Sequence, residues 1–232
     1  FSTGASTSVI ILEIGQVNNE ALQNPKCLEA MWYAMDREKI NKECFQGLGN
    51  IINGAYPSET KYFSPGKEIT YDINKAKQLL AEAGYEDGFE FTLDVIVGIP
   101  FAEKFAQIWQ AGLAQSGITC NIDKLEASLW IEHYLDRSMD VILNWYTMPG
   151  KDPSVFDSTI TAPLISAGFP DPDNMLNLIE EGKSETDSSK REQIYKELQE
   201  IIMSEYPYYI PQEMPILFGW VKELKGVEVN SF

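Results

Sequence analysis

The sequence predicts an α/β fold in which helices flank a central sheet. From about residue 72 to residue 145, segments with helical periodicity alternate with short apolar segments that are typical of strands. Hydrophobic residues make up 44% of the 232 residues, enough to bury a large core. The longest apolar runs, such as residues 9–12, are far shorter than the roughly 20 residues of a membrane-spanning helix. We therefore expect one globular domain and no membrane span in this stretch.

The first element is a strand, because residues 9–14 are apolar and mostly β-branched. Asn24 and Pro25 then predict the start of a helix, since Asn is a good N-cap and Pro fits the first helical turn. Asp36 predicts the cap of a second, short helix. Residues 50–70 are rich in Gly, Pro, Ser and Tyr without periodicity, which indicates a long loop that is either a surface excursion or part of a site.

Three helix and strand pairs follow this loop. The expected helices span residues 72–83, 101–115 and 128–136, and the expected strands span residues 89–97, 118–122 and 140–145. The remainder is mostly helical, with a short helix over 170–181 and a long one that Asp187 caps and Pro207 ends. Two strand-like pieces close the chain, one from Ile210 and one over 218–221.

Charge and residue types exclude several functions. The chain carries 35 Asp and Glu against 18 Lys and Arg, so its net charge of −17 repels nucleic acids and anionic lipids. Its three cysteines lack CxxC spacing, and His133 is the sole histidine, which leaves no metal-ligand set and no Ser/His/Asp triad. We expect no enzymatic activity, no metal and no cofactor.

Several segments together resemble the family 5 extracytoplasmic solute-binding proteins, the peptide and nickel type, of ABC importers. Residues 24–38 resemble the family's NPxVRxALxYAIDRE helix pair, and residues 71–89 resemble its YDPEKAKxLLAEAGYxDGF block. Further matches in the same order are residues 113–118 with LxxIGI, residues 130–135 with WxxYLxR, and residues 186–208 with ETDxxKRxxLYxxxQxIxxExxPYIP. The resemblance covers nearly all of residues 20–211.

The resemblance implies a two-lobed protein of which this chain is the C-terminal lobe. That lobe is expected to have the periplasmic-binding-protein-like type II fold, a mixed sheet flanked by helices. Residues 1–20 are then a hinge or connecting strand, residues 21–208 the ligand-binding lobe, and residues 209–232 return strands toward the missing N-terminal lobe. Residues 1–4 show neither an initiator Met nor a signal peptide, so the expected targeting segment lies outside this sequence.

The function that the resemblance implies is solute capture without chemistry on the solute. The expected partners are a small-molecule or peptide-like solute, ABC permease subunits and the missing lobe, but no nucleic acid. The expected location is extracytoplasmic, in the periplasm or as a cell-surface lipoprotein. The alternative is an extracellular sensor or adhesion module that kept the lobe without transport.

The predicted ligand contacts gather where the last strand of the alternating region ends. This strand runs into Trp145, Tyr146, Thr147 and Met148 before a Pro-Gly turn, so its large flat side chains lie at a sheet edge, where open α/β sheets bind ligands. The stretch resembles the family's DxxLxGWxADYPDP, whose aromatic and following residues line the pocket. We add Trp130 and Tyr56, the former on the WxxYLxR segment and the latter in the long loop. The competing interpretation is that these aromatics are core and rim residues.

One departure from the family pattern concerns the solute. The family's Asp that pairs with a peptide's amino terminus falls on Pro149 in an ungapped match and on Met148 if the aromatic is matched to Trp145. A buried ammonium without a counter-charge costs several kcal/mol, so free peptides are expected to bind poorly unless Asp152 replaces the missing acid. Blocked peptides, oligosaccharides or other uncharged solutes are favoured.

Overall fold

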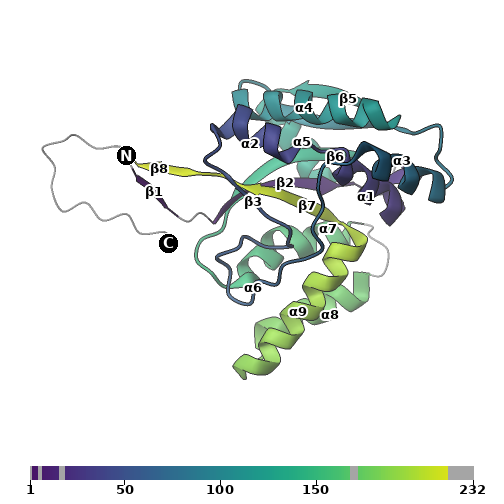
Figure 1. Ribbon diagram of the computed structural model, residues 1–232. Coiled ribbons are helices and arrows are strands. Elements are labelled where there is room, and N and C mark those ends of the chain that lie inside the picture. The colour runs from purple at the N-terminus through teal and green to yellow at the C-terminus, as the bar shows by residue number, and fades with distance from the viewer. Residues whose placement is uncertain (1, 5–6, 16–18, 168–171, 219–232) are drawn as a thin grey trace, which may run out of the picture.

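The computed structural model describes residues 2–4, 7–15, 19–167 and 172–218, and its centre is a six-stranded mixed sheet (Figure 1). The strand order is β3-β7-β2-β6-β4-β5, in which β4 is parallel to β5 and β6 and the other neighbours are antiparallel. These strands are β2 (Ser8–Ile14), β3 (Asn50–Ile51), β4 (Glu90–Ile96), β5 (Thr119–Leu125), β6 (Val141–Thr147) and β7 (Tyr208–Glu213). The predicted mixed α/β sheet is confirmed.

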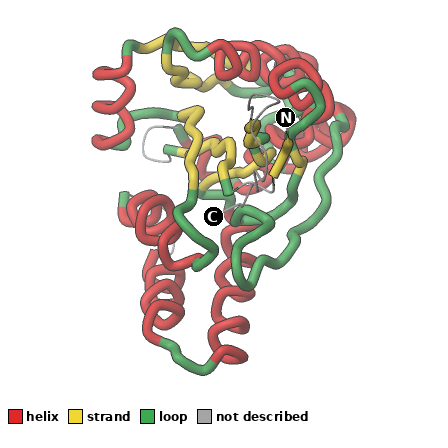
Figure 2. Tube along the Cα trace, turned by 90° about the vertical axis from the view of Figure 1, so that its left-hand side faces the viewer, coloured by secondary structure: helices red, strands yellow, loops and turns green. Residues whose placement is uncertain are grey.

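Helices cover both faces of the sheet, as the two helical layers of Figure 2 show. A short 3₁₀ helix, Glu20–Gln23, leads into the first layer, which holds α1 (Pro25–Tyr33), α2 (Arg37–Phe45), α3 (Ile73–Glu82) and α4 (Pro100–Ser116). The second layer holds α5 (Ala127–Asp136), α6 (Pro153–Phe156), a π-helix (Asp157–Thr161), α7 (Ala162–Ser166), α8 (Pro172–Ser184) and α9 (Ser188–Glu205). Because β2 is buried on both faces, its residues 9–12 form a continuous apolar run.

Most helix starts are those that the sequence predicts. The side chain of Asn24 accepts a hydrogen bond from the backbone N–H of Lys26, and Asp36, Asp72 and Asp187 cap α2, α3 and α9 in the same manner. These caps satisfy backbone donors that a helix start otherwise leaves without partners. The predicted helix over 170–181 begins at Pro172 in the described residues, and its first two positions lie outside them.

The long loop of residues 52–69 is fixed by side chains from other parts of the fold. Arg37, buried beneath it, donates through Nη1 to the Ile52 carbonyl at 2.7 Å and through Nη2 to Asn53 Oδ1 at 2.9 Å and to the Ile69 carbonyl. Glu213 accepts from the Ser58 backbone N–H at 2.5 Å. The loop is therefore a packed part of the lobe.

The two chain ends leave the sheet side by side. A separate two-stranded ribbon pairs β1 (Ser2–Gly4) antiparallel with β8 (Ile216–Phe218), at the left of Figure 1. The inner strands β2 and β7, by contrast, belong to the lobe's own sheet. The segments predicted over 1–20 and 209–232 as connections to another lobe therefore include strands of this lobe's own sheet. We propose that only the ribbon of β1 and β8 has the connecting role. Of the strand predicted over 218–221, residues 219–221 lie outside the described residues.

Candidate functional site

The candidate site is the edge of the sheet where the parallel strands β4, β5 and β6 end, which we call the carboxyl edge. Helices α4 and α5 begin there, and the last residue of β6, Thr147, pairs with Ser8 at the start of β2. The ribbon of β1 and β8 leaves the lobe at the same side (Figure 1). Ligands of open α/β sheets bind outside the carboxyl ends of the strands, so the fold places the predicted site residues where such a ligand binds.

A chain of aromatic rings runs around this edge, from the face of the sheet under α2 and α4 to the face under α5. The ring of Trp145 lies 5.5 Å from that of Phe101 at the start of α4 and 6.4 Å from that of Trp130 on α5. Phe101 in turn contacts Phe45 of α2 at 5.7 Å, and Trp130 stacks on Tyr134 at 5.6 Å. Trp145 is half-buried and Trp130 is 9% exposed, with an indole Nε1 that has no hydrogen-bond partner among the described residues.

Tyr146 and Thr147 complete the exposed end of β6. The Tyr146 ring points to the other face of the sheet, where it contacts Phe156 at 5.6 Å and donates a hydrogen bond to Thr159 Oγ1 at 3.4 Å. Thr147 is exposed, and its Oγ1 lies 2.8 Å from the hydroxyl of Ser8. Trp145, Tyr146 and Thr147 therefore remain accessible at the carboxyl edge and present rings and hydroxyls.

Met148 and Tyr56 are buried, which favours a supporting role for them over contact with a solute. The backbone N–H of Met148 donates to the Thr7 carbonyl at 3.1 Å, and the hydroxyl of Thr7 donates to the Met148 carbonyl at 2.8 Å. Tyr56 donates to both carboxyl oxygens of Asp157 at 2.8 and 3.0 Å. Neither side chain has exposed surface in this lobe, so direct solute contact by these two residues stays a prediction.

Asp157 is a buried acid with a shifted pKa that the sequence analysis does not predict. It lies in the π-helix, fully buried, and burial raises the pKa of its carboxyl to about 7, although hydrogen bonds from Tyr56 and Thr161 work in the opposite direction. The available signal was an Asp next to Phe156 and three residues before Ile160, with a Thr four residues later. This network anchors the long loop to the π-helix beside the carboxyl edge.

The structure argues against Asp152 as an acceptor for a solute ammonium. Arg191 of α9 binds both of its carboxyl oxygens at 2.8 Å, and the carboxyl also caps α6 through the backbone N–H of Ser154 at 3.0 Å. The hydrogen bonds from Arg191 lower the pKa of Asp152 to about 2. Residues 141–151 contain no other acid, so this stretch offers no unpaired carboxylate.

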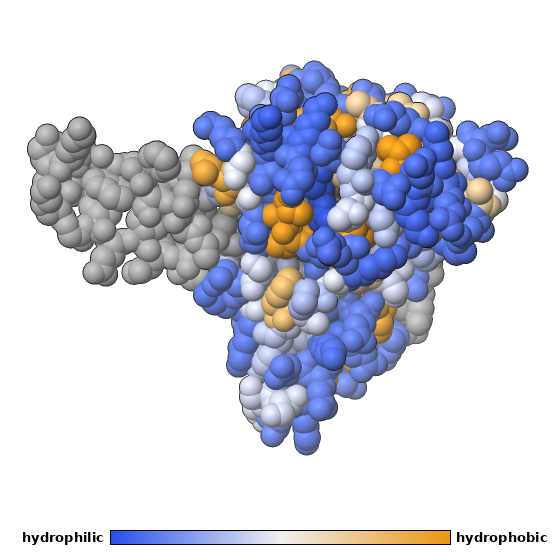
Figure 3. Space-filling model, viewed as in Figure 1, coloured by the Kyte–Doolittle hydropathy of each residue, from blue (hydrophilic) through white to orange (hydrophobic). Residues whose placement is uncertain are grey.

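Large apolar side chains are exposed around the carboxyl edge. Leu48 after α2, Val97 after β4 and Leu129 in the first turn of α5 are each about 40% exposed. Most of the surface that Figure 3 shows is hydrophilic, with only scattered apolar residues.

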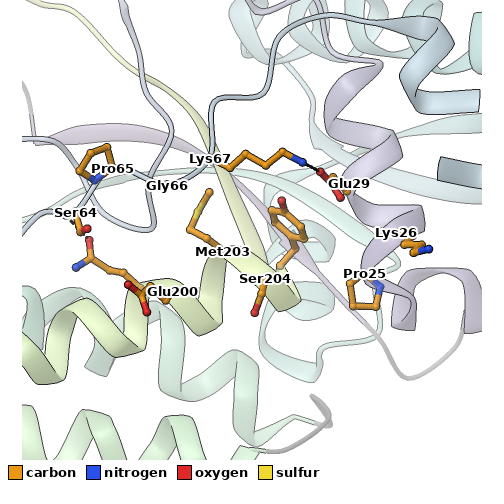
Figure 4. Close-up of a pocket in the computed structure, with 12 residues that line it drawn as sticks. Pro25, Lys26, Glu29, Ser64, Pro65, Gly66, Lys67, Glu200, Met203 and Ser204 are labelled. Atoms are coloured by element: carbon orange, nitrogen blue, oxygen red, sulfur yellow. Dashed lines mark hydrogen bonds and ion pairs between the residues drawn. The ribbon is translucent and has the colours of Figure 1, made fainter. Parts of the chain in front are cut away.

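A pocket of about 510 Å³ opens elsewhere on the lobe (Figure 4). It lies between the start of α1, the loop of residues 64–67 and the end of α9, with Met203 and Tyr206 among its lining residues. Lys67 binds Glu29 across it, and this hydrogen bond raises the pKa of the lysine. None of the predicted site residues lines this pocket.

Comparison with known proteins decides the family. A model described as bacterial extracellular solute-binding proteins, family 5 Middle, matches residues 1–182. The chain belongs to this family. It is 27% identical over 224 residues to the dipeptide-binding protein of Escherichia coli and 29% identical over 205 residues to the glutathione-binding protein GsiB of Salmonella paratyphi A. These matches cover 92% and 83% of this chain but only 42% and 40% of the relatives, so the chain spans about two fifths of their length.

Solved structures of other bacterial proteins share this fold. The dipeptide-binding protein of Pseudoalteromonas sp. SM9913, in complex with Met-Leu, matches 92% of this chain and 44% of its own with a TM-score of 0.81 at 25% identity. HbpA2 of Haemophilus parasuis reaches a TM-score of 0.83 at 21% identity over 92% of this chain and 44% of its own. The fold is that of the periplasmic-binding-protein-like type II structures, as the sequence predicts.

Two further observations concern the described residues alone. None of the described helices has the length and apolar character that crossing a bilayer requires. In the same part of the chain, no three His, Cys, Asp or Glu side chains are arranged to hold a metal ion.

Proposed function

We propose that the full-length protein is the solute-binding component of an ABC importer and that this chain supplies one of its two lobes. The observation that carries the proposal is the carboxyl edge of a family 5 chain, where the rings of Trp145 and Tyr146 are partly exposed, one on each face of the sheet. A solute held between this edge and the other lobe would favour the closed state, because it gains contacts from both lobes only there. The closed state is the form that we expect the permease subunits to bind.

The proposed role involves no catalysis. His133 is hydrogen-bonded through Nδ1 to Asp94 at 2.7 Å, and no hydroxyl or thiol of the described residues is bonded to its ring. A nucleophile needs a base within hydrogen-bond reach, which is the arrangement missing around this histidine.

The proposed solute is peptide-like or a saccharide and carries no free ammonium group toward this lobe. Relatives are named for dipeptides and for glutathione, which supports a peptide-like solute. The strand end and the following loop contain only one acid, and Arg191 occupies it. We therefore favour N-blocked peptides and neutral sugars over unmodified di- and tripeptides. The proposed location is extracytoplasmic, in the periplasm or at the cell surface as a lipoprotein.

Calorimetry of the full-length protein tests the site. We expect Trp145→Ala and Tyr146→Ala each to weaken solute binding by about 1 to 2 kcal/mol, or roughly five- to thirty-fold, because truncated pocket aromatics usually cost this much. Tyr71→Ala is the matched control, since Tyr71 is also exposed but lies next to α3. Solute affinity unchanged within about 0.5 kcal/mol in both edge variants would show that the pocket is elsewhere.

Asp152→Asn tests the solute class. Since Arg191 already binds both oxygens of Asp152, we expect this change to leave solute affinity unaltered and unmodified tripeptides to bind weakly to either protein. Micromolar binding of unmodified peptides that is lost in Asp152→Asn would contradict our assignment of the missing counter-charge. Micromolar binding that survives the change would place that charge on the other lobe.

A further inference from the structure

Helix α5 is attached to the sheet mainly by charge. Of its ten residues only Trp130 is buried, while Leu129, Ile131 and Leu135 are exposed at 41%, 48% and 69%. A helix of a globular lobe normally buries an apolar stripe. Apolar packing therefore contributes little to the docking of α5, although this helix forms one side of the carboxyl edge.

The face of the sheet beneath α5 carries a row of acids, which we call the carboxylate row. Glu13 of β2 and Asp94 of β4 both pair with Ile142 of β6, and Asp94 also pairs with Asp123 of β5, so the three acids lie at one level across neighbouring strands. Glu13 and Asp94 are buried at 0% and 3% exposure, and this burial raises the pKa of each carboxyl. Buried carboxylates need partners, since an unpaired one is strongly destabilising.

A histidine and an arginine near the end of α5, four residues apart, supply those partners. His133 Nδ1 lies 2.7 Å from Asp94 Oδ2, and Arg137 Nη1 lies 2.9 Å from Glu13 Oε2. Glu13 also accepts from Asn144 Nδ2 at 2.7 Å. Residues four apart on a helix share a face, so α5 is held to the carboxylate row at two points.

These two contacts are connected to Trp130 through stacked groups. The Arg137 guanidinium lies 4.3 Å from the centre of the Tyr134 ring, Tyr134 stacks on Trp130, and Trp130 contacts Trp145. A shift of the end of α5 away from the sheet therefore moves the ring of Trp130 relative to Trp145.

We propose that His133 and Arg137 are positioning residues for the solute site, which clamp α5 to the carboxylate row and hold Trp130 against Trp145, so that solute affinity follows the charge of His133. The inference rests on the proposed function. Histidine is the side chain whose charge ordinarily changes between pH 5 and pH 8. The charged or titratable groups around the His133–Asp94 pair are Asp123 of β5 and Asp140 before β6, which act on Asp94, and Tyr134 and Arg137 at the end of α5, which contact each other. Loss of the imidazolium charge leaves this mostly acidic surrounding with Arg137 as its cation, which weakens the clamp.

Fluorine NMR of the full-length protein labelled with 5-fluorotryptophan tests the clamp without any solute. A soluble paramagnetic probe measures the accessibility of each indole, and Trp130→Phe assigns the resonance of Trp130. We expect the paramagnetic relaxation of Trp130 to rise at least two-fold between pH 5.5 and pH 8. Trp109 serves as internal control, since it is fully buried and its indole donates to the Met31 carbonyl at 3.0 Å.

The variants separate the charge of His133 from general effects of pH. We expect the rise to disappear in His133→Gln and in Asp94→Asn, and to persist in Glu132→Gln, which removes an exposed charge from the same helix. His133→Gln leaves the buried carboxylate of Asp94 without its histidine partner and can destabilise the fold. Asp94→Asn removes that carboxylate, so this variant tests the same contact without an unpaired buried acid. Equal relaxation of Trp130 at both pH values, or a rise that persists in His133→Gln, would overturn the inference.

Solute affinity provides the second measurement. We expect affinity to fall at least three-fold from pH 5.5 to pH 8 in the natural protein and to be constant in His133→Gln. Equal solute affinity at pH 5.5 and pH 8 in the natural protein would contradict the coupling between the clamp and the site. If no solute binds but the relaxation of Trp130 rises with pH as expected, the result supports the clamp and contradicts the proposed function.

Discussion

The surroundings of Asp152 and Asp157 shift the pKa of these two acids in opposite directions. Asp152 meets a guanidinium, and its pKa falls to about 2, whereas Asp157 meets only hydroxyl groups, and burial raises its pKa to about 7. Asp152 therefore favours the folded state when it is ionised, and this contribution is lost as the pH falls toward 2. Asp157 favours the folded state when it is protonated, so its contribution is complete below about pH 4 and is lost as the pH rises through about 7.

Asp157→Asn is expected to flatten the loss of stability between pH 5 and pH 8. The amide cannot ionise, but its carbonyl still accepts a hydrogen bond from Tyr56. Relative to the natural chain, the variant should gain as much as about 3 kcal/mol of unfolding free energy over this range, since one pKa unit corresponds to about 1.4 kcal/mol. Urea denaturation at both pH values measures it, with Glu197→Gln on the exposed face of α9 as control. An identical pH dependence in Asp157→Asn would show that the carboxyl is ionised throughout.

Among the elements, the loop of residues 52–69 depends most on one distant side chain. Arg37 lies at the start of α2 and binds both ends of the loop, at Ile52 and Ile69. A planar guanidinium reaches several acceptors at once, which a lysine ammonium cannot do in the same geometry.

Arg37→Lys is expected to destabilise the lobe by about 2 to 3 kcal/mol, because buried carbonyls lose charge-assisted hydrogen bonds. Limited proteolysis should then cut within residues 57–62 before any other segment. Lys39→Arg on the exposed face of α2 is the control. Loss of stability without new cleavage in the loop would mean that Arg37 acts on α2 rather than on the loop.

Elements with local signals could be predicted from the sequence, whereas features that depend on pairing between distant strands could not. Asn24, Asp36, Asp72 and Asp187 carry their capping function in their own neighbourhood, and all four cap helices. The carboxylate row arises only when β2, β6 and β4 come into register, which periodicity does not reveal. Burial of Met148 and Tyr56 likewise depends on how the long loop covers the sheet. The residue pattern of the strand predicted over 140–145 placed Trp145 and Tyr146 at the strand end correctly.

The whole lobe has two hydrophobic cores that share one sheet. Trp109 belongs to the core under α1–α4, and Phe156 belongs to the core on the opposite face. Because β2 contributes side chains to both, neither core is complete without the same strand.

The 232-residue chain is expected to unfold in one cooperative transition. Circular dichroism and tryptophan fluorescence should give coincident urea curves, as a two-state domain does. Trp109→Ala and Phe156→Ala should each lower the unfolding free energy by about 3 to 5 kcal/mol and shift both curves together. Two separate transitions, one for each variant, would show that the faces of the sheet fold independently.

In the ribbon of β1 and β8, the strand that enters the lobe lies beside the strand that leaves it. Its described ends are antiparallel partners, with Gly4 opposite Ile216 and Ser2 opposite Phe218. A domain whose first and last strands are adjacent and antiparallel can be inserted into a β-hairpin of another protein. It then replaces the turn of that hairpin and leaves the two host strands paired. The lobe could therefore be transplanted whole into an unrelated scaffold, such as a fluorescent reporter, and carry its row of rings with it.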